Sequence, residues 1–304
     1  MRRLNLKIAR WLAAGILSTL FFAFYALFSK LSTFQSPLTT NLIICVIIAI
    51  CGLSYGLSAK KLRFSRESAI SGIFANIAIV VMLFALVSNQ VLVVFSFVAF
   101  SSVVFFAIMI VLERPKLSTS QEALSIIGIL VSTLGLFLAS TSTAGGLTHL
   151  VTHSTVNPYF LLLGPVIPIS LGVWAYLSFV AIKKLRLKIQ TVVFNYSYGS
   201  LFVALIAYIL FGSNSQLPTF SQIKDFYPVI AGLFVMGGLL LTLKSYEMTS
   251  GESRIEEIIV AILANGEIVP LIFLSYFVLR EFTIEGIVGA FTVFIGLSIL
   301  NSAR

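Results

Sequence analysis

The residues of this chain best suited to chemistry are acidic side chains in apolar surroundings. Glu267 lies in the apolar run of residues 255–279, two residues after Asn265 and three before Pro270. An ionised group at the centre of a bilayer costs about 2.5–3.5 kcal/mol even on permissive insertion scales, so it normally faces a partner or a water-filled cavity. Three roles fit Glu267: it pairs with a cationic group of a substrate, it takes up and releases a proton, or it holds neighbouring helices together.

Other charged residues lie near the start of the same run. Glu256 precedes Glu267 by eleven residues, about three helical turns, and so lies on nearly the same helical face. Lys244 precedes a short turn at residues 249–252, and an antiparallel hairpin would bring it to the depth of Glu256 and Glu257. We expect a structural ion pair there. If Lys244 instead reached Glu267, both would become candidates for a gate.

Polar and aromatic side chains in other apolar runs are candidates for lining a transport path. Together with Asn265, these candidates are Tyr25, Asn76, Trp174, Tyr176, Asn195 and Tyr198. Aromatic faces attract cations, so a path with these rings and one carboxylate suits an organic cation or an amino acid. For each aromatic residue taken alone, packing or anchoring at the membrane interface explains its presence equally well.

Sequence patterns for other kinds of chemistry are missing. The two histidines, His149 and His153, lie four residues apart in one expected loop, and neither HExxH nor GxSxG occurs. We therefore expect no catalytic residue, no metal site and no cofactor. The net charge is +9, but the basic residues are spread over short loops without a nucleic-acid-binding motif. No nucleic-acid partner is expected.

The elements that carry these residues are predicted to be transmembrane helices. Of the 304 residues, 59% are hydrophobic and only 10% are charged, with a mean hydropathy of +1.06. No soluble core of this size needs so little charge. A helix that crosses the hydrocarbon core takes about 20 apolar residues. Runs of this kind predict an all-α integral membrane protein with ten spans, at residues 11–29, 39–58, 69–87, 91–112, 122–140, 159–182, 191–212, 227–246, 255–279 and 283–301.

The distribution of Lys and Arg predicts the orientation of the chain. With both termini in the cytoplasm, all but three of the 20 basic residues fall on the cytoplasmic side, the exceptions being Lys30, Lys224 and Arg280. This is a strong positive-inside pattern. The basic stretch before residue 11 is expected to begin the first span, because no convincing cleavage site follows it. We expect a multi-pass protein of the cytoplasmic (plasma) membrane.

The chain is predicted to contain two similar halves of five spans each, residues 1–145 and 146–304. The fifth span of each half carries two glycines seven residues apart, Gly128 with Gly135 and Gly289 with Gly296. Small residues at this spacing let helices approach closely, either within one chain or between two copies in a homodimer. Because five is odd, the second half enters the membrane from the opposite side. Inverted repeats of this kind are typical of secondary transporters, which bind substrate near the midplane.

The motifs of the two halves resemble those of the drug/metabolite transporter superfamily, specifically its EamA-type members with two five-helix repeats. The resemblance covers essentially the whole chain. It rests on an aromatic-small-basic pattern at residues 22–30 and 174–184, on apolar runs closed by Glu113 and Glu281, on the paired glycines, and on Pro270. The chain differs in being rich in Phe. The resemblance implies a permease for small metabolites such as amino acids, amines or related solutes, with a cavity lined by the first four spans of each half.

We therefore expect a secondary transporter that works by alternating access, not an enzyme. Its expected partners are a small-molecule substrate, the surrounding lipid and, if transport is proton-coupled, a proton. A flippase for lipids or lipid-linked sugars on the same fold is the alternative, because a fold does not fix its cargo. A lateral opening toward lipid would favour that alternative. An intramembrane enzyme is a less favoured alternative.

Overall fold

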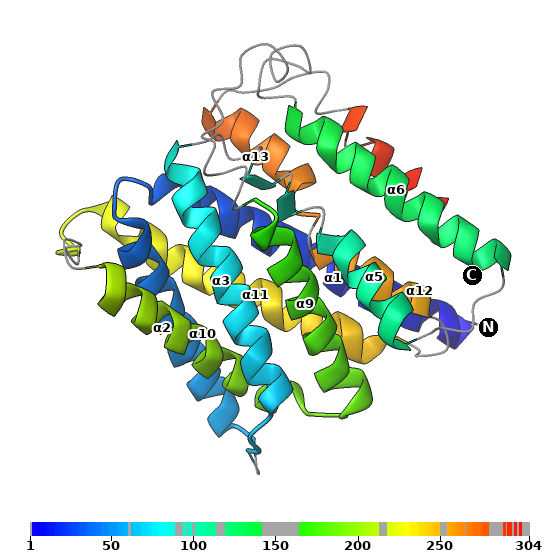
Figure 1. Ribbon diagram of the computed structural model, residues 1–304, viewed down its shortest axis with the longest axis horizontal. Coiled ribbons are helices and arrows are strands. Elements are labelled where there is room, and N and C mark those ends of the chain that lie inside the picture. Colours follow the sequence, from blue (N-terminus) through cyan, green and yellow to red (C-terminus); the bar gives the residue numbers. More distant parts are fainter. Residues whose placement is uncertain are drawn as a thin grey trace.

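The computed structural model describes most of the chain as helices (Figure 1). The residues described are 2–59, 62–88, 94–95, 97–98, 101–113, 119–141, 164–212, 218–249, 254–264, 266–279, 288–289, 291–293, 295–296 and 298–299. None of these residues lies in a β-strand. The helices are α1 (Arg2–Leu31), α2 (Pro37–Leu57), α3 (Arg66–Ser88), α5 (Ser101–Glu113), α6 (Thr119–Thr141), α9 (Val166–Phe179), α10 (Ile189–Phe211), α11 (Tyr227–Met248), α12 (Arg254–Ala264) and α13 (Ile268–Leu279).

Seven of the helical segments in the described residues are long and apolar enough to cross a membrane. These segments are Arg10–Leu31, Pro37–Leu57, Arg66–Val87, Val166–Lys184, Ile189–Phe211, Ile223–Met248 and Glu256–Leu274. Two shorter apolar helices, Ser101–Glu113 and Ser120–Gly135, lie beside them. The protein is therefore a multi-pass helical membrane protein. Predicted spans 91–112, 159–182, 255–279 and 283–301 fall partly outside the described residues.

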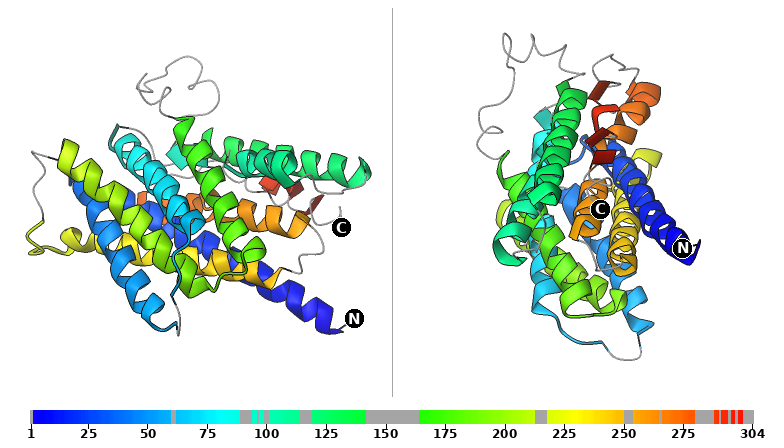
Figure 2. Two further views of the ribbon diagram at one scale, coloured as in Figure 1. Left: turned by 60° about the horizontal axis from the view of Figure 1, so that its bottom comes forward. Right: turned by 90° about the vertical axis from the view of Figure 1, so that its right-hand side faces the viewer.

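The helices form because a chain in lipid must satisfy its backbone hydrogen bonds internally. Local signals then set the helix starts: Pro37 begins α2 at a position where its missing N–H is not needed. The bundle is assembled mainly between the two halves of the chain. Helix α1 packs along α11, α9 packs along α3, and α2 packs against α10 (Figures 1 and 2).

Glycines allow the closest of these contacts. A Cβ atom added to Gly72 in α3 would strike the backbone of Tyr196 in α10, and one added to Gly199 would strike the backbone of Ala69 in α3. No side chain other than hydrogen fits at either position, since the atoms in the way belong to the main chain. The two helices therefore touch backbone to backbone.

The predicted glycine seam also packs within the chain. A Cβ on Gly135 in α6 would lie 2.5 Å from Val293 N and 2.7 Å from Gly289 O. In return, Gly296 faces the backbone of Ser132 and Gly128. Figure 2 shows α6 and the C-terminal segment, in red, together at one side of the bundle. The prediction that these small residues serve close helix packing is confirmed.

The predicted continuous span 255–279 is wrong in one respect: it is two helices, α12 and α13. Gly266 and Glu267 lie between them, outside regular helix. Pro270 is the third residue of α13, a first-turn position where a backbone N–H would have no helical partner anyway. Thr19 Oγ1 of α1 donates to Leu263 O at 2.5 Å, satisfying a carbonyl near the end of α12.

Polar contacts join several helix ends at one end of the bundle, called here the basic end and defined by Arg63, Lys183 and Lys184. Asn195 Nδ2 in α10 donates to Arg63 O at 2.9 Å. The two lysines belong to a π-helical turn, Val180–Lys184, that extends α9. Lys183 Nζ donates to Thr249 O, directly after α11, at 2.7 Å.

The start of α1 lies at the same end, because Ser245 Oγ in α11 donates to Trp11 O at 2.7 Å. The other end of α1 carries Lys30, whose Nζ donates to Leu86 O near the end of α3 at 2.8 Å. The lysines of α1 and α9 that contact neighbouring helices therefore lie at opposite ends of the bundle.

Candidate functional site

A buried cavity lies where α1, α3, α9, α10 and α11 meet the break between α12 and α13. The cavity wall, as far as the structure describes it, is formed by Phe22, Tyr25, Ala75, Ile79, Met82, Leu171, Trp174, Tyr196, Val235, Ala264 and Glu267. It has a volume of about 40 Å³. Because one water needs roughly 10–15 Å³ of such space, the cavity holds a few waters at most. Side chains must move before a metabolite fits.

Glu267 is the one acidic residue on the described wall. Its side chain is buried, and Oε2 has no hydrogen-bond partner in the described part of the chain. The residue directly precedes α13, whose N-terminus carries a partial positive charge that stabilises a nearby carboxylate. The helix break thus places an acceptor at the cavity and offsets part of the cost of burying it.

Tyr25 and Trp174 face the same cavity from α1 and α9. Both are buried, and among the described residues neither the Tyr25 hydroxyl nor Trp174 Nε1 has a hydrogen-bond partner. The Trp174 ring packs edge-on against Phe22, with centroids 6.2 Å apart and planes at 88°. The cavity therefore combines hydrogen-bond donors, a carboxylate oxygen and aromatic faces. The structure brings these three predicted site residues together.

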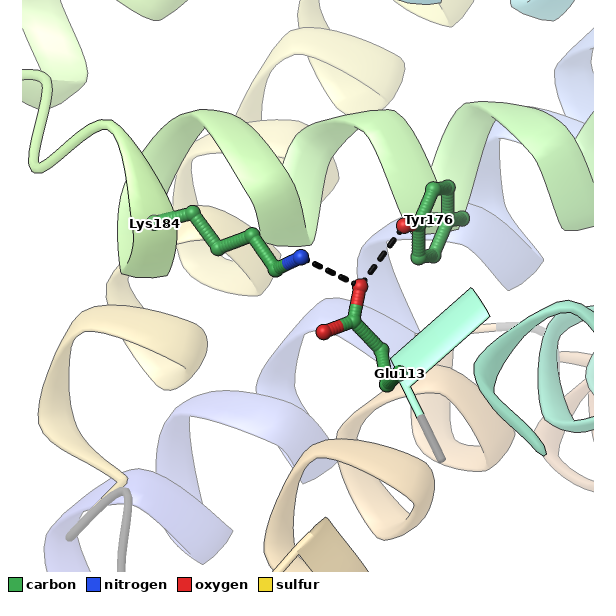
Figure 3. A network of polar contacts seen from close by, with 3 residues as sticks. All are labelled: Glu113, Tyr176 and Lys184. Carbon is green, nitrogen blue, oxygen red and sulfur yellow. Dashed lines mark hydrogen bonds and ion pairs between the residues drawn. The ribbon is translucent and has the colours of Figure 1, made fainter. Parts of the chain in front are cut away.

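Tyr176 does not line the described cavity. Its hydroxyl donates to Glu113 Oε1 at 2.7 Å, and the same oxygen pairs with Lys184 Nζ at 2.6 Å (Figure 3). Tyr176 lies two residues from Trp174, about 200° around the helix, so the two side chains leave α9 in different directions. The prediction that both line the path is not supported by this geometry.

Asn76 and Asn195 are buried but lie outside the described cavity wall. Asn76 Nδ2 donates to Asn41 Oδ1 at 3.0 Å and to Cys45 Sγ at 2.8 Å, which joins α3 to α2. Asn195 Oδ1 accepts from Ser65 N at 3.2 Å at the basic end. Hydrogen bonds within the bundle explain both amides, to α2 for Asn76 and to the segment before α3 for Asn195, because a buried polar group needs a partner.

Tyr198 was expected in the cavity, but it faces outward. Its side chain is 54% exposed and packs against Phe194, with ring centroids 4.7 Å apart. The residue that α10 contributes to the cavity is Tyr196, which is 3% exposed. Sequence reasoning missed Tyr196 because apolar side chains of α10 contact both lipid and neighbouring helices, so hydropathy does not show which of two nearby tyrosines points inward.

Lys244 pairs with Glu247, three residues further along α11, on an exposed face of the helix. The expected ion pair with Glu256 or Glu257 is therefore wrong, as is a contact with Glu267. A residue three positions away on the same helix is always within reach, whereas a pair across the hairpin needs both side chains to turn inward. Glu256 and Glu257 are buried in α12.

One predicted site residue, Asn265, lies outside the described residues. So do His149 and His153, which were expected to lie in a loop. Among the residues that are described, no group of three or more His, Cys, Asp or Glu side chains could hold a metal ion.

Comparison with known proteins shows the fold alone. No family model matches the chain, and no curated protein matches it. Among solved structures, 27 chains are similar. One, described only as a crystal structure of a protein, aligns with a TM-score of 0.70 at 14% identity, over 94% of this chain and 94% of that chain. The helix arrangement thus recurs in a solved structure across nearly the full length of both chains.

Proposed function

We propose that this protein is a secondary transporter that moves a small metabolite across a membrane by alternating access. The observation that carries the proposal is Glu267, whose buried carboxylate faces a central cavity at the break between α12 and α13. Carriers commonly bind substrate near the midplane, at the interface of two repeats and beside discontinuous helices. A buried acid with one oxygen that has no partner among the described residues is suited to binding a ligand.

The packing of the helices supports two five-span repeats. Suppose that α1, α2, α3 and α5 of the first half correspond to α9, α10, α11 and the α12–α13 pair of the second. Exchanging each helix for its counterpart then relates the main contacts between the halves to one another. The α1–α11 contact becomes α9–α3, α2–α11 becomes α10–α3, and α1 with α12 and α13 becomes α9–α5; α2–α10 maps onto itself. All of these contacts occur.

The lysine contacts support an inverted relation between the halves. Lys30, at the end of the first helix of one half, donates to the carbonyl of Leu86 near the end of the third. Lys183, near the end of the first helix of the other half, donates to Thr249 O after the third. These equivalent contacts lie at opposite ends of the bundle. The arrangement is the one that an EamA-type permease would have, with repeats at residues 1–145 and 146–304.

The chemistry of the cavity favours an amine or an amino acid as cargo. No Lys or Arg belongs to the described wall, so a cationic group on the cargo meets Glu267 without competition there. Aromatic rings of Phe22 and Trp174 add cation–π attraction. The donors of Tyr25 and Trp174 suit an acceptor on the cargo, such as a carboxylate. Release of the cargo would let Glu267 take up a proton, which couples transport to a proton gradient.

A groove on the lipid side separates this proposal from a flippase. It has a volume of about 240 Å³ and is almost wholly apolar, with Ile16 and Leu20 of α1 on one side and Phe273 of α13 on the other. None of the residues assigned to its wall also lines the cavity. The described residues that line the polar cavity thus differ from those that line the apolar groove, which favours a water-soluble cargo over a lipid headgroup.

Replacing the acid tests the function. The purified protein in detergent is screened for thermal stabilisation by amines, amino acids and quaternary ammonium ions, because a ligand that binds the folded state raises its stability. Uptake of each stabilising compound is then measured in proteoliposomes with and without a proton gradient. We expect Glu267→Gln to keep the fold and to lose both the stabilisation and the gradient-driven uptake.

The matched control is Glu247→Gln, which removes an exposed carboxylate far from the cavity and should change neither readout. Gradient-driven uptake that is the same in Glu267→Gln and wild type would remove Glu267 from the mechanism. Chemical conversion of a compound in detergent, where no transport is possible, would instead indicate an enzyme.

A further inference from the structure

An ion pair between two helices stands at the basic end of the bundle. Glu113 is the last residue of α5, and its Oε1 accepts from Tyr176 of α9 and from Lys184 of the π-helical turn (Figure 3). The Glu113 side chain is 6% exposed and that of Lys184 is 43% exposed. The carboxylate is thus largely removed from water, which gives the contact more weight than an exposed pair has.

The π-helical turn also connects α9 to α11. Lys183 Nζ donates to Thr249 O at 2.7 Å, while the next residue, Lys184, reaches α5. Two successive lysines therefore hold two different neighbours of α9. Short π-helical turns are rare and occur frequently at functional sites, because they alter the direction of side chains locally.

Three buried rings lie beside this contact. Phe105 of α5, Phe179 of α9 and Tyr246 of α11 are each fully buried. The ring centroids of Phe105 and Phe179 are 6.4 Å apart, and those of Phe179 and Tyr246 are 6.3 Å apart. This ring cluster brings together the same three elements that Lys183 and Lys184 join.

The order of residues along the helices places the ring cluster between the cavity and the basic end. On α9, Trp174 lines the cavity, Phe179 follows five residues later and Lys184 five residues after that; each step is about 7.5 Å along the axis. On α11 the order is Val235 at the cavity, then Tyr246, then Thr249. Along the axes of α9 and α11, the rings therefore lie between the cavity and the basic end, and the Glu113–Lys184 ion pair lies beyond Phe179.

We propose that the ring cluster and the contact of Glu113 with Tyr176 and Lys184 form the gate that closes the cavity at the basic end. The inference rests on the proposed transport function, because only a carrier needs to open that end. Opening moves α9 away from α5 and separates Glu113 from both partners. The contact therefore biases the protein toward the state closed at the basic end, and weakening it shifts the population toward the open state.

Accessibility of a cysteine in the cavity tests the gate. Ala75, a small residue on the cavity wall, is changed to Cys in a protein with Cys45→Ser and Cys51→Ser. A membrane-impermeant thiosulfonate is applied to vesicles from the side of the basic end. We expect slow labelling in this reference protein and labelling roughly five- to thirtyfold faster after Glu113→Gln, the effect of losing one charge-assisted contact.

Matched variants separate a gate from a structural role. Glu113→Lys combined with Lys184→Glu restores opposite charges and should return labelling toward the reference rate. Lys244→Gln breaks an exposed ion pair within α11 alone and should leave the rate unchanged. If Glu113→Gln does not fold, Lys184→Gln tests the same contact from its exposed partner.

An unchanged labelling rate in the single variants, or a charge exchange that labels as fast as they do, overturns the gate. Labelling needs no known cargo, so the outcome is independent of the transport assay. Transport without the expected labelling change contradicts the gate alone, whereas the expected labelling without uptake of any compound contradicts the transport function.

Discussion

At the scale of single residues, the cavity is defined by polar atoms that the described protein leaves without partners. The Tyr25 hydroxyl, Trp174 Nε1 and Glu267 Oε2 are all buried in this state. Leaving a buried polar group unpaired costs about 1–3 kcal/mol. A ligand that supplies partners to these three groups would recover part of that cost on binding.

The substitution Trp174→Phe tests whether the unpartnered Nε1–H of Trp174 serves to bind the cargo. The substitution keeps an aromatic ring against Phe22 but removes the unpaired N–H, so we expect the free energy of unfolding to change by less than about 1 kcal/mol. Thermal stabilisation by the cargo should fall, since the donor is lost. Tyr198→Phe, on the outward face of α10, is the control and should bind as the wild type does. A large loss of stability without any loss of binding would assign Trp174 to packing.

At the scale of the elements, the break between α12 and α13 determines where Glu267 lies. A hydrogen bond ties the break to α1: Thr19 Oγ1 donates to Leu263 O, which also accepts from Gly266 N at 3.2 Å. Pro270 fits because α13 has only just begun, and a Cβ atom added to Gly266 would lie 3.0 Å from Ile262 O of α12 and 3.8 Å from the Thr19 methyl of α1. The position of the acid therefore depends on a contact between α1 and α12.

Thr19→Val should weaken that contact. The substitution keeps the shape of the side chain but leaves Leu263 O without its donor from α1, so we expect a loss of about 1–2 kcal/mol in stability, measured as a lower midpoint of thermal unfolding in detergent. Thr19→Ser keeps the hydroxyl and serves as the control, with a smaller loss. Equal losses in the two variants would show that the methyl group matters and the hydrogen bond does not.

At the scale of the whole molecule, the two ends of the bundle differ in charge. Lys183, Lys184 and Arg63 gather at the basic end, while Lys30 and Lys224 lie toward the other end, the latter with its Nζ 5.2 Å from the centre of the Phe34 ring. Lys and Arg near membrane spans are retained in the cytoplasm during insertion. The basic end is therefore expected to face the cytoplasm.

Two surface cysteines test this orientation. Ser58, directly after α2, and Ser221, before α11, are both exposed. In a protein with Cys45→Ser and Cys51→Ser, we expect an impermeant thiol reagent to label Ser58→Cys only from the cytoplasmic side of the membrane and Ser221→Cys only from the opposite side. Labelling of both from one side would contradict the orientation and, with it, the inverted arrangement of the halves.

Hydropathy predicts most of the spans that the structure describes, because a helix in lipid must be long, apolar and internally hydrogen-bonded. It also marks Glu267, since a carboxylate is conspicuous among apolar residues. The small-residue spacing of Gly128 and Gly135 correctly predicts a close contact, because only glycine allows two backbones to meet there. Hydropathy, charge and side-chain size belong to the residue itself and do not depend on how the helices are arranged.

The tertiary structure alone decides which side chains face one another. It selects Tyr196 over Tyr198, pairs Lys244 with Glu247, directs Tyr176 to Glu113 and divides one predicted span into α12 and α13. In water, an apolar stripe tells which face of a helix turns inward. In a membrane both lipid and protein are apolar, so the sequence determines that these helices lie in the bilayer, and only their packing decides which faces meet around Glu267.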